Sequence, residues 1–534
     1  MSGAQGGQAR PRVRATDDAG PRGARVPGGG FARQVHAEWT KFRTIRGWVA
    51  GLAVAALVTA LLGLLSASSS HASCGPTDAA CPAVPVGPDG GAVNDKFFFV
   101  HRSLTGDGSI TVRVTSMTGQ IRKPDATPGV RNVVSGVVPW AKAGVLVKDG
   151  TRQGSAYAAV MVTGAHGVRM QHNYTHDVAG RPGGVSRQSP RWLRLTRSGE
   201  TVTGAESADG ARWTTLGSVR LAGLPATVRI GMFAASPGDL TVTRGDLGGS
   251  VTAVRFAETT AVFDEVSLGG GTSGEAWRHD DVGVTLEPDG SPHHPGRAET
   301  SGATFTVTGV GDIGPSAEGM SVENTLTGVP AGLIVVIVVA VSFVTAEYRR
   351  GLIRTSLLAV PARGRVVAAK AVVIVAVTFV AALAACAVAV TYGTGILRDN
   401  GNQVLPVPWL TEVRVVAGVA ALFDATAVLA LGLGFLFRGS AAAVTGAIAV
   451  TVVPHILATA SVLPAEAAQW LLRLTPAAGF AIWQSVPEYA HVLDTYTPQA
   501  GYYPLPPWAG LAVSCGYAAL AVALAIVRLH RSDV

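Results

Sequence analysis

Six segments of the chain are nearly free of charged residues and consist mainly of apolar ones. These segments cover residues 47–66, 327–346, 367–392, 413–437, 440–462 and 507–527. The hydrocarbon core of a bilayer is about 30 Å thick, and an apolar helix of about 20 residues crosses it. Each segment reaches that length, so the pattern predicts an α-helical membrane bundle of six spans.

The pattern changes between the first and the second span, where short runs of β-branched and aromatic residues alternate with clusters of Gly, Pro, Asp and Ser. The runs cover residues 97–100, 110–114, 143–147, 157–162, 168–171, 192–195, 228–232, 256–266 and 304–310. Many short strands with regular turns are typical of a β-sandwich. The sequence therefore predicts a multi-domain protein, in which an all-β sandwich over residues 95–326 is inserted between spans one and two.

Three further segments complete the division of the chain. Residues 1–30 are rich in Gly, Arg, Pro and Ala, which predicts a disordered tail, and residues 67–94 form a linker rich in Gly, Pro and Ala. In residues 31–46, apolar side chains recur at steps of three and four between basic ones. These apolar residues are Phe31, Val35, Trp39, Phe42 and Ile45. Their spacing predicts an amphipathic helix that lies at the membrane surface and leads into the first span.

The formal net charge of +8 is concentrated outside the β region. Residues 67–326 contain 22 Lys and Arg against 24 Asp and Glu, whereas the rest of the chain contains 21 against 11. Basic residues that flank spans stay in the cytoplasm, so we do not expect a nucleic-acid partner. They precede the first span and follow the second, fourth and sixth. This predicts a multi-pass plasma-membrane protein with both termini cytoplasmic and residues 67–326 extracellular.

Two cysteines lie just beyond the first span, in Cys74-Gly-Pro-Thr-Asp-Ala-Ala-Cys81. On the oxidising side of the membrane, a disulfide between Cys74 and Cys81 is favoured over two free thiols. Cys386 and Cys515 lie inside spans and are interpreted as packing residues. A cleaved signal peptide is the alternative for the first span, and the long N-terminal region before it argues against cleavage.

The β region contains no residue pattern that indicates catalysis or a metal site. A retaining glycosidase needs two carboxyl groups about 5–5.5 Å apart, whereas Asp264 and Glu265 would lie on opposite faces of a strand. The histidines lack the spacing of a zinc motif. Trp140 and Trp192 are compatible with a carbohydrate platform or with core packing, and packing is favoured. We therefore expect no catalytic residues and no metal in this chain.

Two polar residues lie inside predicted spans. Asp424 is near the middle of the fourth span, where an ionisable group costs roughly 2.5–3.5 kcal/mol and normally faces the protein interior. It is interpreted either as a residue of a transport pathway or as a helix-pairing hydrogen-bond partner. His455 follows Pro454 in the fifth span, and packing at a helix kink is favoured over a pairing with Asp424.

Residues 95–265 resemble the concanavalin-like, laminin-G-like sandwich domains of secreted bacterial proteins. The resemblance is carried by the segments 140–149, 191–199, 207–214 and 230–234, which match successive strands in order and spacing. It implies a jelly-roll fold and no particular ligand. The Ala-, Arg-, Gly- and Val-rich composition is typical of a high-GC bacterium, such as an actinobacterium.

The flanks of the spans resemble permease subunits of type-2 ATP-binding-cassette (ABC) exporters. His36-Ala-Glu-Trp-Thr-Lys-Phe-Arg-Thr-Ile-Arg46 is similar to the connecting helix of that family, and residues 347–355 with 361–370 are similar to its coupling loop. Residues 463–480 are similar to the short outer helices before the last span, within the outer region 463–506. The large β domain departs from the family, most members of which have a short loop there.

The resemblance implies roles for particular residues and partners. In the family, the loop matching residues 347–366 contacts the ATPase subunit. The ATPase-coupling residues would be Glu347, Tyr348, Arg349, Arg350, Arg354, Arg363 and Arg365, and those of the connecting helix Glu38, Trp39, Lys41 and Arg43. No Gly-x-x-x-x-Gly-Lys-Ser/Thr sequence occurs, so ATP and Mg²⁺ would be bound by a separate ATPase subunit and no cofactor by this chain. A second permease copy is also expected.

Two functions remain open on the sequence. The first is a transmembrane permease subunit of an ABC exporter, which is not an enzyme by itself. The alternative is a membrane-anchored protein whose β domain binds or senses a cell-wall component or another glycan. A partner ATPase is expected for the first function, and binding of a polysaccharide by the β domain for the second.

Overall fold

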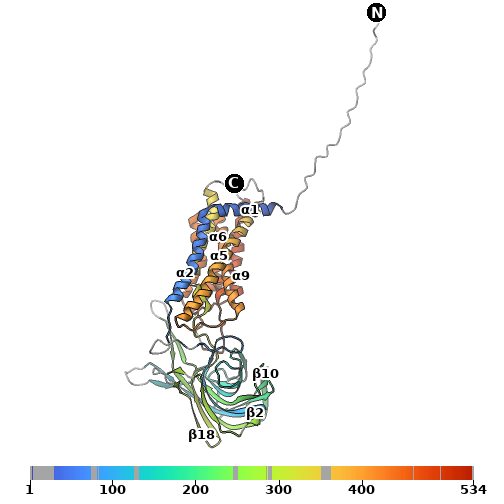
Figure 1. Ribbon diagram of the computed structural model, residues 1–534, viewed down its shortest axis with the longest axis vertical. Coiled ribbons are helices and arrows are strands. Elements are labelled where there is room, and N and C mark those ends of the chain that lie inside the picture. Colours follow the sequence, from blue (N-terminus) through green and yellow to red (C-terminus); the bar gives the residue numbers. More distant parts are fainter. Residues whose placement is uncertain are drawn as a thin grey trace.

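The computed structural model describes Gly3 and residues 29–73, 81, 83–124, 132–244, 250–272, 274–283, 285–286, 292–349, 351, 362–460, 462–493 and 495–531. In these residues the chain forms a bundle of long helices, and an antiparallel β domain lies at one end of the bundle (Figure 1). The expected combination of helices and β domain is thus present.

Six of the described helices are long and apolar enough to cross a membrane. They are α2 (Arg46–Ser69), α3 (Val329–Arg349), α5 (Arg363–Asp399), α6 (Trp409–Phe437), α7 (Ser440–Thr459) and α9 (Pro507–Arg531). These lengths and compositions are compatible with a multi-pass membrane protein. The longest, α5, extends beyond the apolar segment 367–392 at both ends, because polar residues continue the helix there.

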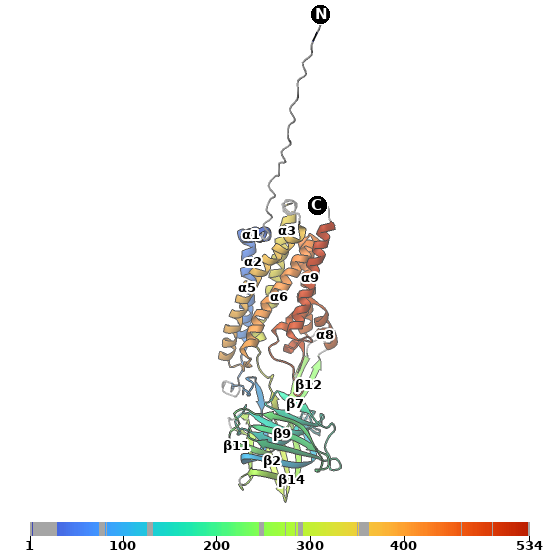
Figure 2. The same ribbon diagram turned by 90° about the vertical axis from the view of Figure 1, so that its right-hand side faces the viewer.

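An additional helix, α1 (Gly29–Thr44), precedes α2 and lies across one end of the bundle (Figures 1 and 2). The C-terminus of the chain is at this same end, and the β domain is at the other. The sequence predicts the β domain after the first span. Among all described helices the β domain follows the second one, α2, because α1 precedes it.

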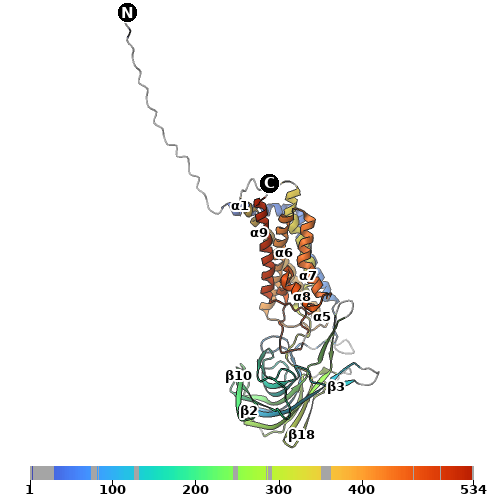
Figure 3. The same cartoon turned by 180° about the vertical axis from the view of Figure 1, so that it is seen from behind.

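Short helices lie near the end of the bundle that faces the β domain. They are α8 (Ala465–Leu474) and the 3₁₀ turns η1 (Val322–Leu326), η2 (Pro476–Trp483) and η3 (Pro498–Ala500). Figure 3 shows α8 beside the lower part of α7, close to the β domain. Of these, α8, η2 and η3 lie in residues 463–506, where short helices are expected, and their position outside the membrane stays a prediction.

The helix α6 forms the centre of the bundle. In its most apolar stretch 72% of the residues are buried, against 22% in α2. Glycines bring the neighbouring helices close: a Cβ at Gly432 of α6 would lie 2.8 Å from Ala521 of α9. Small residues at helix contacts are a common packing device in membranes, where burial of apolar area gives no advantage over lipid.

In the part of the chain that the structure describes, the β domain has twenty strands. They are β1 (Val93–Asp95), β2 (Phe97–Arg122), β3 (Val133–Ser135), β4 (Lys142–Lys148), β5 (Tyr157–Thr163), β6 (Val168–His172), β7 (His176–Ala179), β8 (Arg191–Ser198), β9 (Thr201–Ser207), β10 (Trp213–Arg220), β11 (Thr227–Ala235), β12 (Asp239–Arg244), β13 (Ser250–Arg255), β14 (Ala257–Thr272), β15 (Arg278–Val282), β16 (Thr285–Leu286), β17 (Pro292–His293), β18 (Arg297–Ser301), β19 (Thr304–Gly309) and β20 (Ile313–Pro315).

Strand β2 organises the main sheet, which contains 14 strands among the described residues. Its first part pairs with β11 and β15, and its second part pairs with β8 and β14. One long strand thus belongs to both layers of the antiparallel sandwich, and the apolar runs predicted at 97–100 and 110–114 are parts of that single strand. The finer assignment to a concanavalin-like jelly-roll stays a prediction.

Strands β4 and β5 are buried at every position, on both faces. One face packs against the sandwich core around Val145 and Val160. The other packs against a second cluster around Phe99 and Tyr157. The sequence of a strand that is buried on both faces is a continuous apolar run. Residues Ala143 to Val147 form such a run.

Two lysines at the ends of β4 lie inside the protein and are neutralised there. Lys142 Nζ lies 2.6 Å from Asp312 Oδ1, and Lys148 Nζ lies 2.8 Å from Asp95 Oδ2. Burial lowers the pKa of Lys148, and this effect outweighs the attraction of Asp95. Because Asp95 belongs to β1 and Asp312 precedes β20, these ion pairs hold both ends of the β domain against its central sheet.

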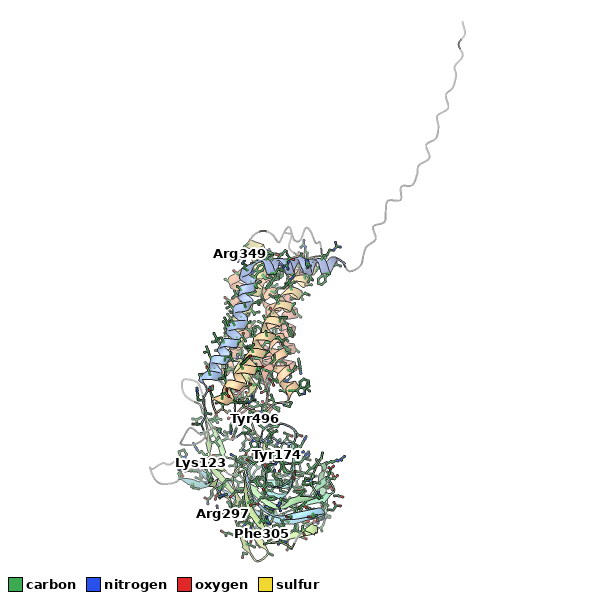
Figure 4. The ribbon with its side chains drawn as sticks, in the orientation of Figure 1. Lys123, Tyr174, Arg297, Phe305, Arg349 and Tyr496 are labelled. Carbon is green, nitrogen blue, oxygen red and sulfur yellow. The ribbon has the colours of Figure 1, made fainter. Side chains whose placement is uncertain are left out.

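Loops from the helical bundle hold the β domain at the junction between the two. The α5–α6 loop bonds to the chain on both sides of the domain: Ala72 N donates to Asn400 O at 3.1 Å, and Leu405 N donates to Met320 O at 2.9 Å. A second loop, 484–503, reaches the sheet, where His491 Nε2 donates to the Tyr174 carbonyl at 2.9 Å. Figure 4 shows Tyr174 and Tyr496 near this junction.

The close packing of α2 against η1 predicts the effect of one methyl group. A Cβ at Gly63 would lie 2.1 Å from the Thr325 backbone oxygen, whereas a Cβ at Gly516 of α9 would meet nothing within 4 Å. We expect Gly63→Ala to lower the free energy of unfolding by about 1–3 kcal/mol. Gly516→Ala should leave it unchanged or raise it slightly. Thermal unfolding in detergent measures both, and equal melting temperatures would contradict this account.

The junction histidine predicts a pH dependence. Burial lowers the pKa of His491, so it stays neutral in the folded protein at pH values where the unfolded chain, with a pKa near 6.5, takes up a proton. Stability should therefore fall as the pH drops below about 6.5. We expect His491→Gln, which keeps a side-chain N–H but does not titrate, to lose less stability than wild type between about pH 7 and pH 5. The melting temperature of each protein over this range measures the difference, and parallel curves would refute it.

Candidate functional site

Four charged side chains from three helices meet at the end of the bundle that α1 crosses. Lys370 Nζ of α5 lies 2.7 Å from Glu38 Oε2 of α1 and 2.8 Å from Glu347 Oε1 of α3. Lys41 Nζ of α1 lies 2.7 Å from Glu38 Oε1 and 3.1 Å from Glu347 Oε1. We call these four residues the charge cluster. It links α1 to α3 and α5, which lie about 300 residues further along the chain.

The amphipathic face of α1 carries Glu38 into the protein. Val35, Glu38 and Phe42 share one side of a helix, because residues three, four and seven apart lie above one another. Phe42 is buried against Trp48 and Phe343, with ring centroids 5.9 Å and 5.5 Å away. Packing of this aromatic group turns the Glu38 carboxylate toward α3 and α5.

The charge cluster is largely withdrawn from solvent. The side chains of Lys370, Glu38 and Glu347 are 0%, 4% and 8% exposed, and that of Lys41 is 41% exposed. The Lys370 ammonium also lies 4.3 Å from the centroid of the Phe343 ring. Removal of a charge from water costs several kcal/mol unless a partner compensates it. Each buried charge here therefore depends on the others.

The cluster is electrically balanced, with two ammonium groups and two carboxylates. Burial pulls the pKa of Lys41 down, but the Glu38 and Glu347 carboxylates outweigh it and raise the pKa above its usual value. Lys41 therefore stays charged at neutral pH. Glu347 Oε2 has no hydrogen-bond partner among the described residues. No described group of His, Cys, Asp and Glu has the arrangement of a metal site.

The other predicted coupling residues that the structure describes lie at the same end of the bundle. Arg438 Cζ lies 5.9 Å from the centroid of the Tyr348 ring. Arg349 is exposed at the end of α3, as Figure 4 shows, and Arg365 is exposed near the start of α5. Arg363 donates to the Leu529 carbonyl of α9, which fixes the start of α5 to the last helix.

Some predicted residues lie apart from the cluster or outside the described chain. Trp39 and Arg43 are on the exposed side of α1, so Trp39 does not belong to the packed face that its spacing predicts. Arg350 and Arg354 lie outside the described residues, with most of the loop 347–366. Cys81 is disulfide-bonded, whereas Cys74 is outside the described residues, so their pairing stays a prediction.

Asp424 and His455 are held in different surroundings. The His455 ring stacks on Phe480, with centroids 3.8 Å apart, and meets Trp483 edge-on at 5.4 Å. Asp424 lies on α6 near Cys515 of α9, and its Oδ1 has no hydrogen-bond partner in the described part of the chain. No hydrogen bond between Asp424 and His455 is found there, and the packing of His455 at a helix kink stays a prediction.

Sequence reasoning missed the central role of Lys370 and the burial of Glu38. Lys370 resembles one more basic residue of a cytoplasmic loop, yet it stands inside the apolar segment 367–392 and is fully buried. An ionisable residue within a span normally has a partner in the protein, and this rule points to Lys370. The sequence does not reveal which carboxylates pair with it, because that depends on how α1 folds back over the bundle.

Comparisons with known proteins add little to this geometry. No protein-family model matches the chain, and no curated protein matches it either. Solved structures with some similarity include scytalido-glutamic peptidase with a transition state analog inhibitor (8% identity, TM-score 0.26, 40% of this chain and 98% of that chain). Another is a functionally unknown protein from Saccharomyces cerevisiae (14% identity, TM-score 0.21, 35% of this chain and 81% of that chain). These TM-scores support no argument about fold or activity.

The unequal burial of the two lysines predicts unequal effects on stability. Lys370→Met leaves Glu38 and Glu347 with one partially exposed cation, and we expect a loss of about 3 kcal/mol, at the lower end for a broken buried pair. Lys41→Met should cost less than about 1 kcal/mol, as exposed pairs do. Equilibrium unfolding in detergent compares the two. Similar losses for both variants would show that Lys370 does not dominate the cluster.

Proposed function

We propose that this chain is the membrane-spanning permease subunit of an ABC exporter, driven by a separate ATPase subunit. The observation that supports the proposal most is the charge cluster. It ties α1 and the ends of α3 and α5 together where the basic loop 347–366 leaves and re-enters the bundle. A partner that presses on this loop would act on three elements at once.

The proposed orientation places the charge cluster on the cytoplasmic side. The helix α1 and the C-terminus share one end of the bundle with most of the basic flanking residues, and basic flanks favour the cytoplasm. The β domain, at the opposite end, would then be extracellular and both termini cytoplasmic. A soluble ATPase has access only to the cytoplasmic end, so the loop and the cluster would be in reach of it.

The proposed mechanism is mechanical rather than chemical. ATP-driven closure of the ATPase dimer would move the loop, and the ion pairs of Lys370 would pass this movement to α1, α3 and α5. The bundle, paired with a second copy of the chain, would switch between inward- and outward-facing states. The buried charge cluster suits this role, because its pairs break only at a cost of several kcal/mol.

Glycan binding by the β domain is the alternative, and its geometry gives it less support. Trp192 and Trp213 lie on the outer face of the sandwich, where a sugar ring would stack. However, the guanidinium of Arg194 lies 3.8 Å from the centroid of the Trp213 ring, and that of Arg113 lies 5.6 Å from the Trp192 ring. Trp140 is buried and stacks on His166. The rings are therefore occupied by neighbours from the same chain.

The proposal predicts that exposed arginines at the cytoplasmic end bind the ATPase. We expect the double variant Arg349→Glu, Arg365→Glu to reduce the amount of ATPase that co-purifies with the full chain by about tenfold or more, because two attractive charges become repulsive. Arg398→Glu, at the opposite end of the bundle, is the matched control and should leave the amount unchanged. Undiminished co-purification with the double variant would refute the proposed contact.

A further inference from the structure

A cavity of about 620 Å³ lies near the end of the bundle that faces the β domain. It is enclosed by the start of α6, the polar side of α8 and the segment 484–507. Two arginines line it, Arg414 from α6 and Arg473 from the last turn of α8. Apart from Arg398 and Arg438, these are the only Lys or Arg residues in the sequence between positions 393 and 506. Two of the few cations of this region thus face one cavity.

Neither arginine is neutralised by an ion pair within the described chain. Arg414 Nη2 donates to the Gln484 carbonyl at 2.7 Å, and the Arg473 guanidinium lies 5.4 Å from the centroid of the Trp470 ring. Glu488 lines the same cavity, and Glu323 acts on Arg414 from beyond ion-pair distance. Each guanidinium carries five N–H donors, so donors remain for a ligand.

Three exposed tryptophans are close in sequence to residues that line the cavity. Trp409, Trp470 and Trp508 are 70%, 57% and 62% exposed, and each is within two residues of the cavity lining, which includes Thr411, Gln469 and Pro507. Tryptophan is enriched at the level of lipid headgroups, where its ring meets the acyl chains and its N–H meets water. The tryptophans therefore place the cavity at the headgroup level of one leaflet.

We propose that this cavity binds the phosphate group of an anionic phospholipid in the leaflet next to the β domain. Arg414 and Arg473 donate to the phosphate oxygens, because the guanidinium group matches phosphate in geometry and charge. The acyl chains lie along the exposed apolar residues Leu410 and Val413 of α6. This site requires helices in a bilayer and is independent of any ATPase partner.

Native mass spectrometry of the full-length protein in neutral detergent tests the proposal. The protein is titrated with dioleoyl phosphatidylglycerol and, separately, with dioleoyl phosphatidylcholine, and the lipid-bound fraction is measured. We expect wild type to bind phosphatidylglycerol at least about tenfold more tightly, and Arg473→Gln to abolish most of this preference. Among the described residues, the Arg473 guanidinium makes a cation–π contact with Trp470 and no hydrogen bond or ion pair, so its replacement should leave the fold intact. The double variant Arg414→Gln, Arg473→Gln should bind both lipids alike.

A control variant and a competition experiment complete the test. Arg398→Gln, near the same end of the bundle but lining another cavity, should keep the wild-type preference. Soluble glycerol phosphate at the same concentration as the lipid should fail to displace it. Equal binding of the two lipids by wild type, or an unchanged preference in the double variant, would overturn the proposal. Displacement by glycerol phosphate would overturn the assignment to a lipid and indicate a soluble phosphate ligand.

Discussion

The pairing of Lys370 with Glu38 and Glu347 is the interaction on which the arrangement of the helical end depends. A fully buried ammonium is tolerated only beside carboxylates, and these come from α1 and α3. The pairing therefore fixes α1 across the bundle, although α1 and α5 are separated in the sequence by more than three hundred residues. The aromatic group of Phe42, Trp48 and Phe343 is buried beside these pairs, with the Phe343 ring centroid 4.3 Å from the Lys370 ammonium. Under the proposed function, these pairs turn a push on a loop into a movement of helices.

The other end of the molecule is joined by different means. Backbone hydrogen bonds connect the α5–α6 loop to the chain on both sides of the β domain, and His491 reaches the sheet itself. The buried pairs of Lys142 and Lys148 in turn hold the ends of the domain to its central strand. The β domain is thus bonded to the loops that join α5 to α6 and α7 to α9. A change of helix arrangement would reach it through these contacts.

Much of the fold follows from the sequence, because its signals are long and local. Six apolar segments and the short strand runs mark helices and strands by periodicity alone. What the sequence does not reveal is how distant parts meet. The strands predicted at 97–100 and 110–114 are parts of one strand, β2. Nothing in the sequence from Leu104 to Ser109 indicates that the chain stays extended between them. Lys370 could be recognised as unusual by its position within an apolar segment. The sequence does not identify the carboxylates that pair with it. Likewise Arg414 and Arg473 are unremarkable in the sequence, because only the folded chain brings them to one cavity.

The central claim is that this chain works as one subunit of an ATP-driven assembly. The composition of the complex purified from native membranes in a mild detergent, through a tag on the full-length chain, tests it most directly. Mass spectrometry should identify a second polypeptide that carries a phosphate-binding Gly-x-x-x-x-Gly-Lys-Ser/Thr loop, in a one-to-one ratio to this chain, and the complex should hydrolyse ATP. Recovery of the folded chain without any nucleotide-binding polypeptide would contradict the claim.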